Sequence, residues 1–266
     1  MCSFDIQLLQ ASIDPEGESD FRILVDNTYV KYLTIDAGIY DPEDMAFGPS
    51  LISLLPPLPP GNWNVGHIRM DPARQQAHFG FTSSLPLPAI TNIWHHSLID
   101  HLELRLGRKL RSNIYKATCP RFDATVIVKF ARFPYEIALL EKETTAYQWI
   151  DGHQIGPTFL GHLTEEGRVI GFVMERVGGG EFRHATADDL RPCCEVLGRL
   201  HRLGIMHGDI NKHNFLVHSG GVTMIDFDCA KRGVGTAELE GELSGLERQL
   251  RDESGRGGRV VESGSG

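Results

Sequence analysis

Two carboxylates and an amide that lie close together in the sequence could bind a metal ion and act on a hydroxyl group. Asp209 and Asn214 have four residues between them, in HGDINKHN, and Asp226 follows in MIDFD. Carboxylate and amide oxygens are ligands that Mg²⁺ uses beside substrate phosphates. A carboxylate that is not a ligand could orient a hydroxyl group and accept its proton. The D-x-x-x-x-N spacing therefore predicts phosphoryl-transfer chemistry, with Asp209 acting on the hydroxyl group.

The sequence between Asn214 and Asp226 predicts elements that bring these two side chains together. Residues 215–217 form a short apolar run, residues 222–225 form another, and the sequence HSGG separates them. This pattern is typical of a β-hairpin, which would return the chain so that Asp226 lies near Asn214. Each polar residue alone could instead cap a turn or end a strand, but the joint pattern favours a kinase-type site.

This stretch resembles the catalytic and metal-binding loops of the protein-kinase-like superfamily, and the resemblance extends over residues 104–228. It implies a two-lobed α+β fold that binds ATP and Mg²⁺. It also implies that Asp209 is the catalytic carboxylate and that Asn214 and Asp226 are metal ligands. A fold of this kind needs a lysine and a glutamate upstream, and both can be sought in the sequence.

The resemblance places the lysine at the end of a strand and the glutamate on the helix that follows. The β-branched run in residues 124–130 predicts a strand, and Lys129 near its end would reach the α- and β-phosphates. Apolar spacing predicts a helix over residues 134–150. Glu143 lies within the apolar stripe of that helix, where an unpaired carboxylate would be costly, so it is the expected partner of Lys129. Glu141, on the polar side of the helix, is the alternative.

The adenine pocket is expected where a strand runs into three glycines, in MERVGGG. This segment resembles the hinge between kinase lobes. The resemblance implies that backbone groups of Glu175 and Val177 hydrogen-bond adenine and that Met174 lines the back of the pocket. Without the other motifs, the segment would indicate only a loop.

The loop that should cover the phosphates departs from the family pattern. Instead of G-x-G-x-x-G, residues 106–115 read LGRKLRSNIY and contain one glycine. Ser112 could still turn the chain and bind phosphate through backbone N–H groups. The basic residues Arg108, Lys109 and Arg111 either add positive charge near the phosphates or form a solvated strand edge. We therefore expect a low affinity for ATP.

Three further departures bear on the acceptor. Asn211 stands where protein serine/threonine kinases usually have a lysine, Gly208 gives His-Gly-Asp in place of His-Arg-Asp, and Asp228 replaces the glycine of Asp-Phe-Gly. These variants resemble aminoglycoside-phosphotransferase-type and RIO-type kinases, and the whole set also resembles uncharacterised fungal kinase-like proteins. The resemblance implies a kinase for a hydroxyl acceptor, with protein Ser/Thr as the first expectation. A small-molecule kinase and a nucleotide-binding pseudokinase or scaffold are the alternatives.

The chain is expected to divide into four segments. Residues 1–103 form a β-rich N-terminal extension, 104–175 the N-lobe, 176–253 a minimal C-lobe, and 254–266 a tail too polar to fold. No large helical subdomain for docking peptides fits in the space that remains. In its place, a helix from about Thr236 would bury one apolar face, made of Leu239, Leu243, Leu246 and Leu250.

Composition fits a soluble enzyme. A chain of 266 residues with 41% hydrophobic residues can bury a sizeable core. The net charge of −9 argues against binding to nucleic acid or to an anionic membrane. Five cysteines without zinc spacing predict free thiols in a reducing compartment. No apolar stretch is long enough to span a membrane and no signal peptide pattern is present, so the cytoplasm, or the nucleus, is expected.

Overall fold

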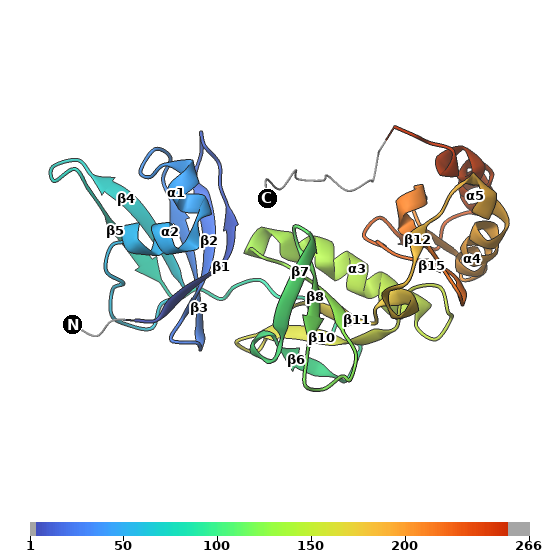
Figure 1. The fold of residues 1–266 in the computed structure, drawn as a ribbon, viewed down its shortest axis with the longest axis horizontal. Coiled ribbons are helices and arrows are strands. Elements are labelled where there is room, and N and C mark those ends of the chain that lie inside the picture. The colour runs from blue at the N-terminus through green and yellow to red at the C-terminus, as the bar shows by residue number, and fades with distance from the viewer. Residues whose placement is uncertain (1–3, 255–266) are drawn as a thin grey trace. The chain divides into compact units, whose positions relative to one another are not determined.

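The computed structural model describes residues 4–254, which form two compact units (Figure 1). Unit 1 consists of the chain up to Ala89 together with Arg132–Glu136 and Glu165–Arg168. Unit 2 consists of Ile90–Ala131, Ile137–Thr164 and the chain from Val169 onward. Apart from Ser254, the tail expected at residues 254–266 lies outside the described residues.

Unit 1 is built on a five-stranded sheet with the order β1-β2-β3-β4-β5. Neighbouring strands are antiparallel except for β3 and β4, which are parallel. Two antiparallel hairpins, β2–β3 and β4–β5, are present, and Asp26 and Asn27 in the first turn have φ near 52°. The elements are β1 (Ile6–Ser12), β2 (Ser19–Val25), β3 (Tyr29–Ile35), α1 (Pro42–Ala46), α2 (Gly48–Leu54), β4 (Val65–Asp71) and β5 (Gln76–Ser83).

Two short segments from later in the chain complete unit 1. Phe133 is buried in an apolar cluster with Leu24, Val30 and Tyr32. The buried Arg22 side chain donates from Nε to Glu165 Oε2 at 2.7 Å, and the Tyr32 hydroxyl donates to Glu165 Oε1 at 2.8 Å. Burial alone would raise the pKa of Glu165, but neighbouring guanidinium groups lower it overall, so the carboxylate stays charged.

Unit 2 contains a six-stranded sheet with the order β6-β10-β11-β9-β8-β7. Because β6 pairs in parallel with β10, the residues before the boundary expected at 103/104 are part of this unit, from Ile90 onward. Helix α3 (Ile137–Ile150) follows β9 along the chain. The strands are β6 (Leu98–Asp100), β7 (Arg105–Arg111), β8 (Ile114–Thr118), β9 (Val126–Phe130), β10 (Phe159–Glu165) and β11 (Arg168–Met174).

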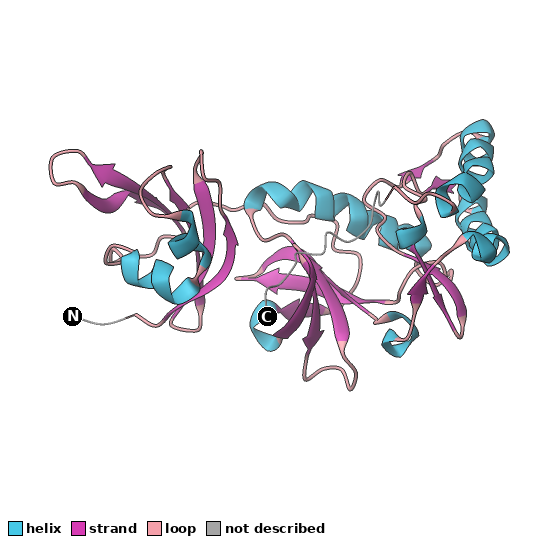
Figure 2. Cartoon of the chain, turned by 45° about the horizontal axis from the view of Figure 1, so that its top comes forward, coloured by secondary structure: helices cyan, strands magenta, loops and turns pink. Residues whose placement is uncertain are grey.

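The remainder of unit 2 holds helices α4 and α5 and two small sheets (Figure 2). The predicted hairpin between Asn214 and Asp226 is present, as the antiparallel strands β14 and β15. None of the described helices is long and apolar enough to cross a membrane. The elements are β12 (Arg183–His184), α4 (Leu190–Arg202), β13 (Ile205–Met206), β14 (Phe215–His218), β15 (Gly221–Met224), β16 (Lys231–Arg232) and α5 (Thr236–Leu250). The α+β class expected from the sequence is confirmed.

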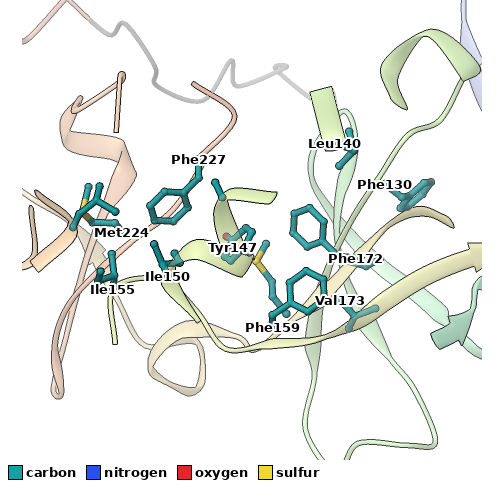
Figure 3. Packing of buried hydrophobic residues seen from close by; sticks show 14 of the residues in the cluster. Phe130, Leu140, Tyr147, Ile150, Ile155, Phe159, Phe172, Val173, Met224 and Phe227 are labelled. Atoms are coloured by element: carbon teal, nitrogen blue, oxygen red, sulfur yellow. Dashed lines mark hydrogen bonds between the residues drawn. The ribbon is translucent and has the colours of Figure 1, made fainter. Parts of the chain in front are cut away.

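One hydrophobic core runs through unit 2 and fixes the chain at Asp226. Tyr147 of α3 packs against Phe172 of β11 at a ring-centroid distance of 5.2 Å, and against Phe227 at 5.4 Å (Figure 3). Phe227 is fully buried and follows Asp226 directly. The aromatic cluster therefore ties the position of Asp226 to α3 and to the six-stranded sheet.

Helix α5 buries only part of the expected face. Leu246 and Leu250 are buried, but Leu239 is half-buried and Leu243 is 37% exposed, so the prediction of four buried leucines is wrong at Leu239 and Leu243. The buried stripe contains Glu242 instead, whose side chain is 6% exposed. Glu242 and Leu243 point about 100° apart around the helix, so the buried stripe is rotated toward Glu242.

Candidate active site

A buried ion pair joins β9 to α3, as expected from the apolar stripe of the helix. Lys129 Nζ lies 2.6 Å from Glu143 Oε2 and 2.7 Å from Asp226 Oδ1. The alternative residue, Glu141, accepts hydrogen bonds from the backbone N–H groups of Thr91 and Asn92. The structure therefore brings Lys129, Glu143 and Asp226 together and leaves Glu141 outside the group.

Burial and the neighbouring charges shift the pKa values of Lys129, Glu143 and Asp226 in opposite directions. Burial lowers the pKa of Lys129, but the two carboxylates outweigh it and raise the pKa overall. Burial raises the pKa of Glu143 to about 7, although Lys129 opposes the shift. Burial also acts to raise the pKa of Asp226, but Lys129 and Arg111 lower it overall. Asp226 is therefore the carboxylate that is held charged.

The catalytic-loop residues are held by their own amide groups. Asp209 Oδ2 accepts from Asn211 Nδ2 at 2.9 Å and from Asn214 Nδ2 at 3.2 Å. Asn214 Nδ2 also donates to the Asp209 carbonyl at 2.9 Å, so its amide orientation is fixed by two acceptors. The Ile225 N–H donates to the Asn214 carbonyl at 3.0 Å, which joins the loop to the residue before Asp226.

One oxygen of this loop fits a metal ligand. Asn214 Oδ1 is buried and has no hydrogen-bond partner within residues 4–254. A buried acceptor without a partner is costly, unless a ligand satisfies it. With the charged carboxylate of Asp226 just beyond Ile225, the donor set is one amide oxygen and one carboxylate, which suits Mg²⁺.

Glu242 of α5 holds the backbone of the catalytic loop, a role that the sequence reasoning missed. Its Oε1 accepts from the Gly208 N–H at 2.7 Å, and its Oε2 accepts from the His207 N–H at 3.0 Å. His201 Nε2 of α4 lies 2.7 Å from the same Oε2. The sequence offers only a weak signal for this role: Glu242 lies four residues before Leu246, which places the two residues on neighbouring turns of one helix face.

The glycine of His-Gly-Asp has a structural reason. Gly208 has φ of +84°, and a Cβ atom there would lie 2.5 Å from the carbonyl oxygen of Cys229. Glycine adopts this backbone region without steric cost, whereas an arginine would be strained. Gly208 is therefore required by the backbone path of this loop.

A cavity of about 320 Å³ opens beside the ion pair, within unit 2. The predicted residues Lys129, Glu143, Met174, Glu175, Val177 and Asp226 line it. Ser112, Asp209 and Asn214 are not among its lining residues, and Ser112 lies in the exposed turn between β7 and β8.

One backbone group of the expected hinge already forms a hydrogen bond within the protein. The Glu175 N–H donates to the Thr158 carbonyl at 2.8 Å, so this group is not directed at a ligand. Adenine contacts at the hinge would therefore have to use other backbone groups of Glu175 and Val177, such as the Glu175 carbonyl.

Residues 182–257 match the family described as Lipopolysaccharide kinase (Kdo/WaaP) family. Two curated relatives also match limited regions. Both are described as "Probable bifunctional tRNA threonylcarbamoyladenosine biosynthesis protein". The one from Methanoculleus marisnigri is 42% identical over 59 residues, 22% of this chain and 11% of the relative. The one from Methanothermobacter thermautotrophicus is 36% identical over 81 residues, 29% of this chain and 15% of the relative.

The chain thus spans only a small part of the curated relatives that it matches. The family match covers the catalytic loop, the β14–β15 hairpin and α5, the segments that hold Asp209, Asn214, Asp226 and Glu242. Upstream of that match, the mixed helix and strand content is that of an α+β kinase-like fold. Over residues 182–257 the chain is therefore similar to a protein-kinase-like family, as the catalytic-loop motif predicted.

Proposed function

We propose that the chain is an ATP- and Mg²⁺-dependent phosphotransferase that moves the γ-phosphoryl group to a hydroxyl acceptor. The observation that carries the proposal is the buried Asn214 Oδ1, which lacks a partner within residues 4–254 while Lys129 bridges Glu143 and Asp226 nearby. The kinase family match supports phosphotransferase activity in general. The site would lie between an N-terminal lobe, residues 104–175 together with the paired residues 90–103, and a minimal C-terminal lobe, residues 176–253.

Each residue of the site would have a separate task. Lys129 would bind the α- and β-phosphates, with Glu143 keeping its ammonium group in place. Asn214 and Asp226 would hold Mg²⁺, which supplies charge neutralisation at the phosphates when bound. Asp209 would orient the acceptor hydroxyl and take its proton. Two amide donors hold Asp209 Oδ2, which fixes the direction of the carboxylate before a substrate arrives.

The first acceptor that we propose is a serine or threonine hydroxyl in a protein, which the D-x-x-x-x-N loop favours. A small-molecule acceptor is the second candidate, favoured by the surroundings of Lys212. Lys212 Nζ donates to the Asp252 carbonyl at 2.6 Å, and the Asn211 amide is bonded to Asp209. Neither residue replaces the lysine that protein serine/threonine kinases have near the catalytic aspartate. The name of the matched family, lipopolysaccharide kinase, also names a non-protein acceptor.

Transfer from labelled ATP, measured side by side with a protein extract and with a metabolite and glycolipid extract, tests the proposal. We expect Mg²⁺-dependent labelling in one of the two extracts, and none with Asp209→Asn, which should still bind ATP. Label in protein would select the first acceptor, and label in small molecules the second. If the wild-type chain labels neither extract and binds ATP equally with and without Mg²⁺, the proposal is wrong and a nucleotide-binding pseudokinase takes its place.

A further inference from the structure

Two arginines of strand β7, Arg108 and Arg111, line the cavity. In a regular strand, residues three apart point to opposite faces, yet Arg108 and Arg111 both line the cavity. The pairing of β7 with β8 is irregular between Leu106 and Lys109, and again between Lys109 and Arg111. An extra residue in a strand reverses the alternation beyond it. Arg108 and Lys109 are both exposed, but Lys109 is not among the lining residues, so the three basic residues are not equivalent.

Arg111 reaches from β7 to the carboxylate expected to bind the metal. Its Nη1 lies 3.0 Å from Asp226 Oδ2, while Lys129 contacts the other oxygen of the same carboxylate. Burial is the main cause that lowers the pKa of His184 and of His213, and the charge of Arg111 lowers both further. Both histidines line the cavity, so the guanidinium group lies close to several of its walls.

The charged residues of the cavity are mostly basic. Five basic and three acidic side chains line it, so the cavity suits a ligand with several negative charges. The basic residues are Arg108, Arg111, Lys116, Lys129 and Arg176, and the acidic residues are Glu143, Glu175 and Asp226.

The backbone of the β7–β8 hairpin offers little to an anion. Arg111 pairs with Ile114, which leaves a turn of two residues and no glycine between the strands. Gly107, the one glycine of β7, lies outside this turn, and a Cβ atom there would lie 3.3 Å from the Lys116 carbonyl. A loop whose N–H groups surround a phosphate needs a run of glycines or a helix start, and neither is found here.

We propose that Arg111, with Arg108 beside it, binds the phosphates of the nucleotide through its side chain in place of a glycine-rich backbone loop. A guanidinium group can contact two phosphate oxygens at once. On nucleotide binding Arg111 exchanges its contact with Asp226 for phosphate oxygens, which frees that carboxylate oxygen for a cation. This inference deepens the proposed function and rests on it.

Binding of adenosine, ADP and a non-hydrolysable ATP analogue to the full chain, with and without Mg²⁺, tests this assignment by calorimetry. Arg111→Gln should weaken the binding of ADP and of the analogue by about tenfold or more, and leave adenosine binding within about twofold. Arg111→Lys keeps the charge but loses the two-point contact, so it should give a smaller loss, with the same dependence on phosphate. Lys109→Gln removes the same charge from the same strand and should leave all three ligands within about twofold of wild type.

Each outcome decides one of the two proposals. A wild-type chain that binds no adenine nucleotide refutes the proposed function, and this inference with it. A wild-type chain that binds Mg²⁺–ADP, with Arg111→Gln equal to wild type, refutes only the inference. Equal losses with Arg111→Gln and Lys109→Gln also refute it, because net charge alone would then explain the effect. If Arg111→Gln does not melt cooperatively, the binding of ADP by Arg111→Lys tests the inference instead, and affinity equal to wild type refutes it.

Discussion

Replacing Glu242 by glutamine should disable the catalytic loop from a helix that does not line the cavity. The carboxylate accepts from the Gly208 and His207 N–H groups, at 2.7 Å and 3.0 Å, and lies 2.7 Å from His201 Nε2. Glutamine keeps one acceptor oxygen but turns an amide NH₂ group toward a donor. Losing one hydrogen bond to a buried charge costs about 1.5–3 kcal/mol. For a domain of this size, that loss corresponds to a melting temperature lower by roughly 4–10 °C.

Differential scanning fluorimetry and transfer kinetics on the same preparations measure the effect. We expect kcat to fall more than the affinity for nucleotide, because Asp209 follows Gly208 directly whereas the cavity residues are untouched. Glu240→Gln is the matched control, since Glu240 is exposed on the same helix. A Glu242→Gln protein that melts and turns over like Glu240→Gln would refute the reasoning.

The same residue gives the stability a pH dependence with a definite sign. Burial alone would raise the pKa of Glu242, but His201 and the two backbone N–H groups lower it overall. A carboxylate whose pKa is lower in the folded state contributes stability above its unfolded-state pKa, about 4.3, and loses the contribution as the pH falls through the folded-state value. The gap in melting temperature between wild type and Glu242→Gln should therefore narrow below about pH 5. A gap of constant size from pH 7 to pH 4 would contradict this.

Three further outcomes follow from the site and from α5. Asp226→Ala should abolish the Mg²⁺ dependence of ATP binding, measured by titration with and without the metal; equal wild-type affinity in both conditions would contradict the assignment. Lys129→Met leaves the buried Glu143 carboxylate unpaired, while Asp226 keeps Arg111. It should lower the unfolding free energy by about 3–5 kcal/mol in urea titrations, with part recovered in Lys129→Met/Glu143→Gln. Leu246→Asp should give insoluble or molten protein, whereas Leu243→Asp should melt nearly as wild type does, because Leu243 is already 37% exposed. If both variants lose stability to a similar extent, the assignment of the buried face of α5 is wrong.

Local sequence patterns predict the structure correctly where a residue's surroundings are set by its near neighbours in the chain. The β14–β15 hairpin follows from two apolar runs around a glycine turn. The pairing of Glu143 rather than Glu141 follows from helical periodicity and the cost of burying a lone carboxylate. On α5, apolar spacing favoured Leu243, but the hydrogen bonds that draw Glu242 inward come from segments more than thirty residues away.

Local sequence patterns do not predict pairing between strands that are far apart in the chain. Nothing local to Leu98–Asp100 indicates that it pairs in parallel with β10, so residues 90–103 were assigned to the N-terminal extension. The sequence alone does not distinguish Arg108 and Arg111 from Lys109, because strand irregularities depend on the partner strand. The position of Ser112 in a two-residue turn depends on the same irregular register.

The discontinuous makeup of unit 1 has a consequence for how the chain folds. Arg22 and Glu165 are 143 residues apart, so the N-terminal sheet cannot pair its buried arginine until most of the chain has been synthesised. Contacts between residues so far apart in the chain form slowly during folding. A folding intermediate that lacks them exposes apolar surface. A fragment ending at residue 89 would lack both Phe133 and Glu165 and should aggregate. We therefore expect the N-terminal region to need residues 132–136 and 165–168 for a stable fold.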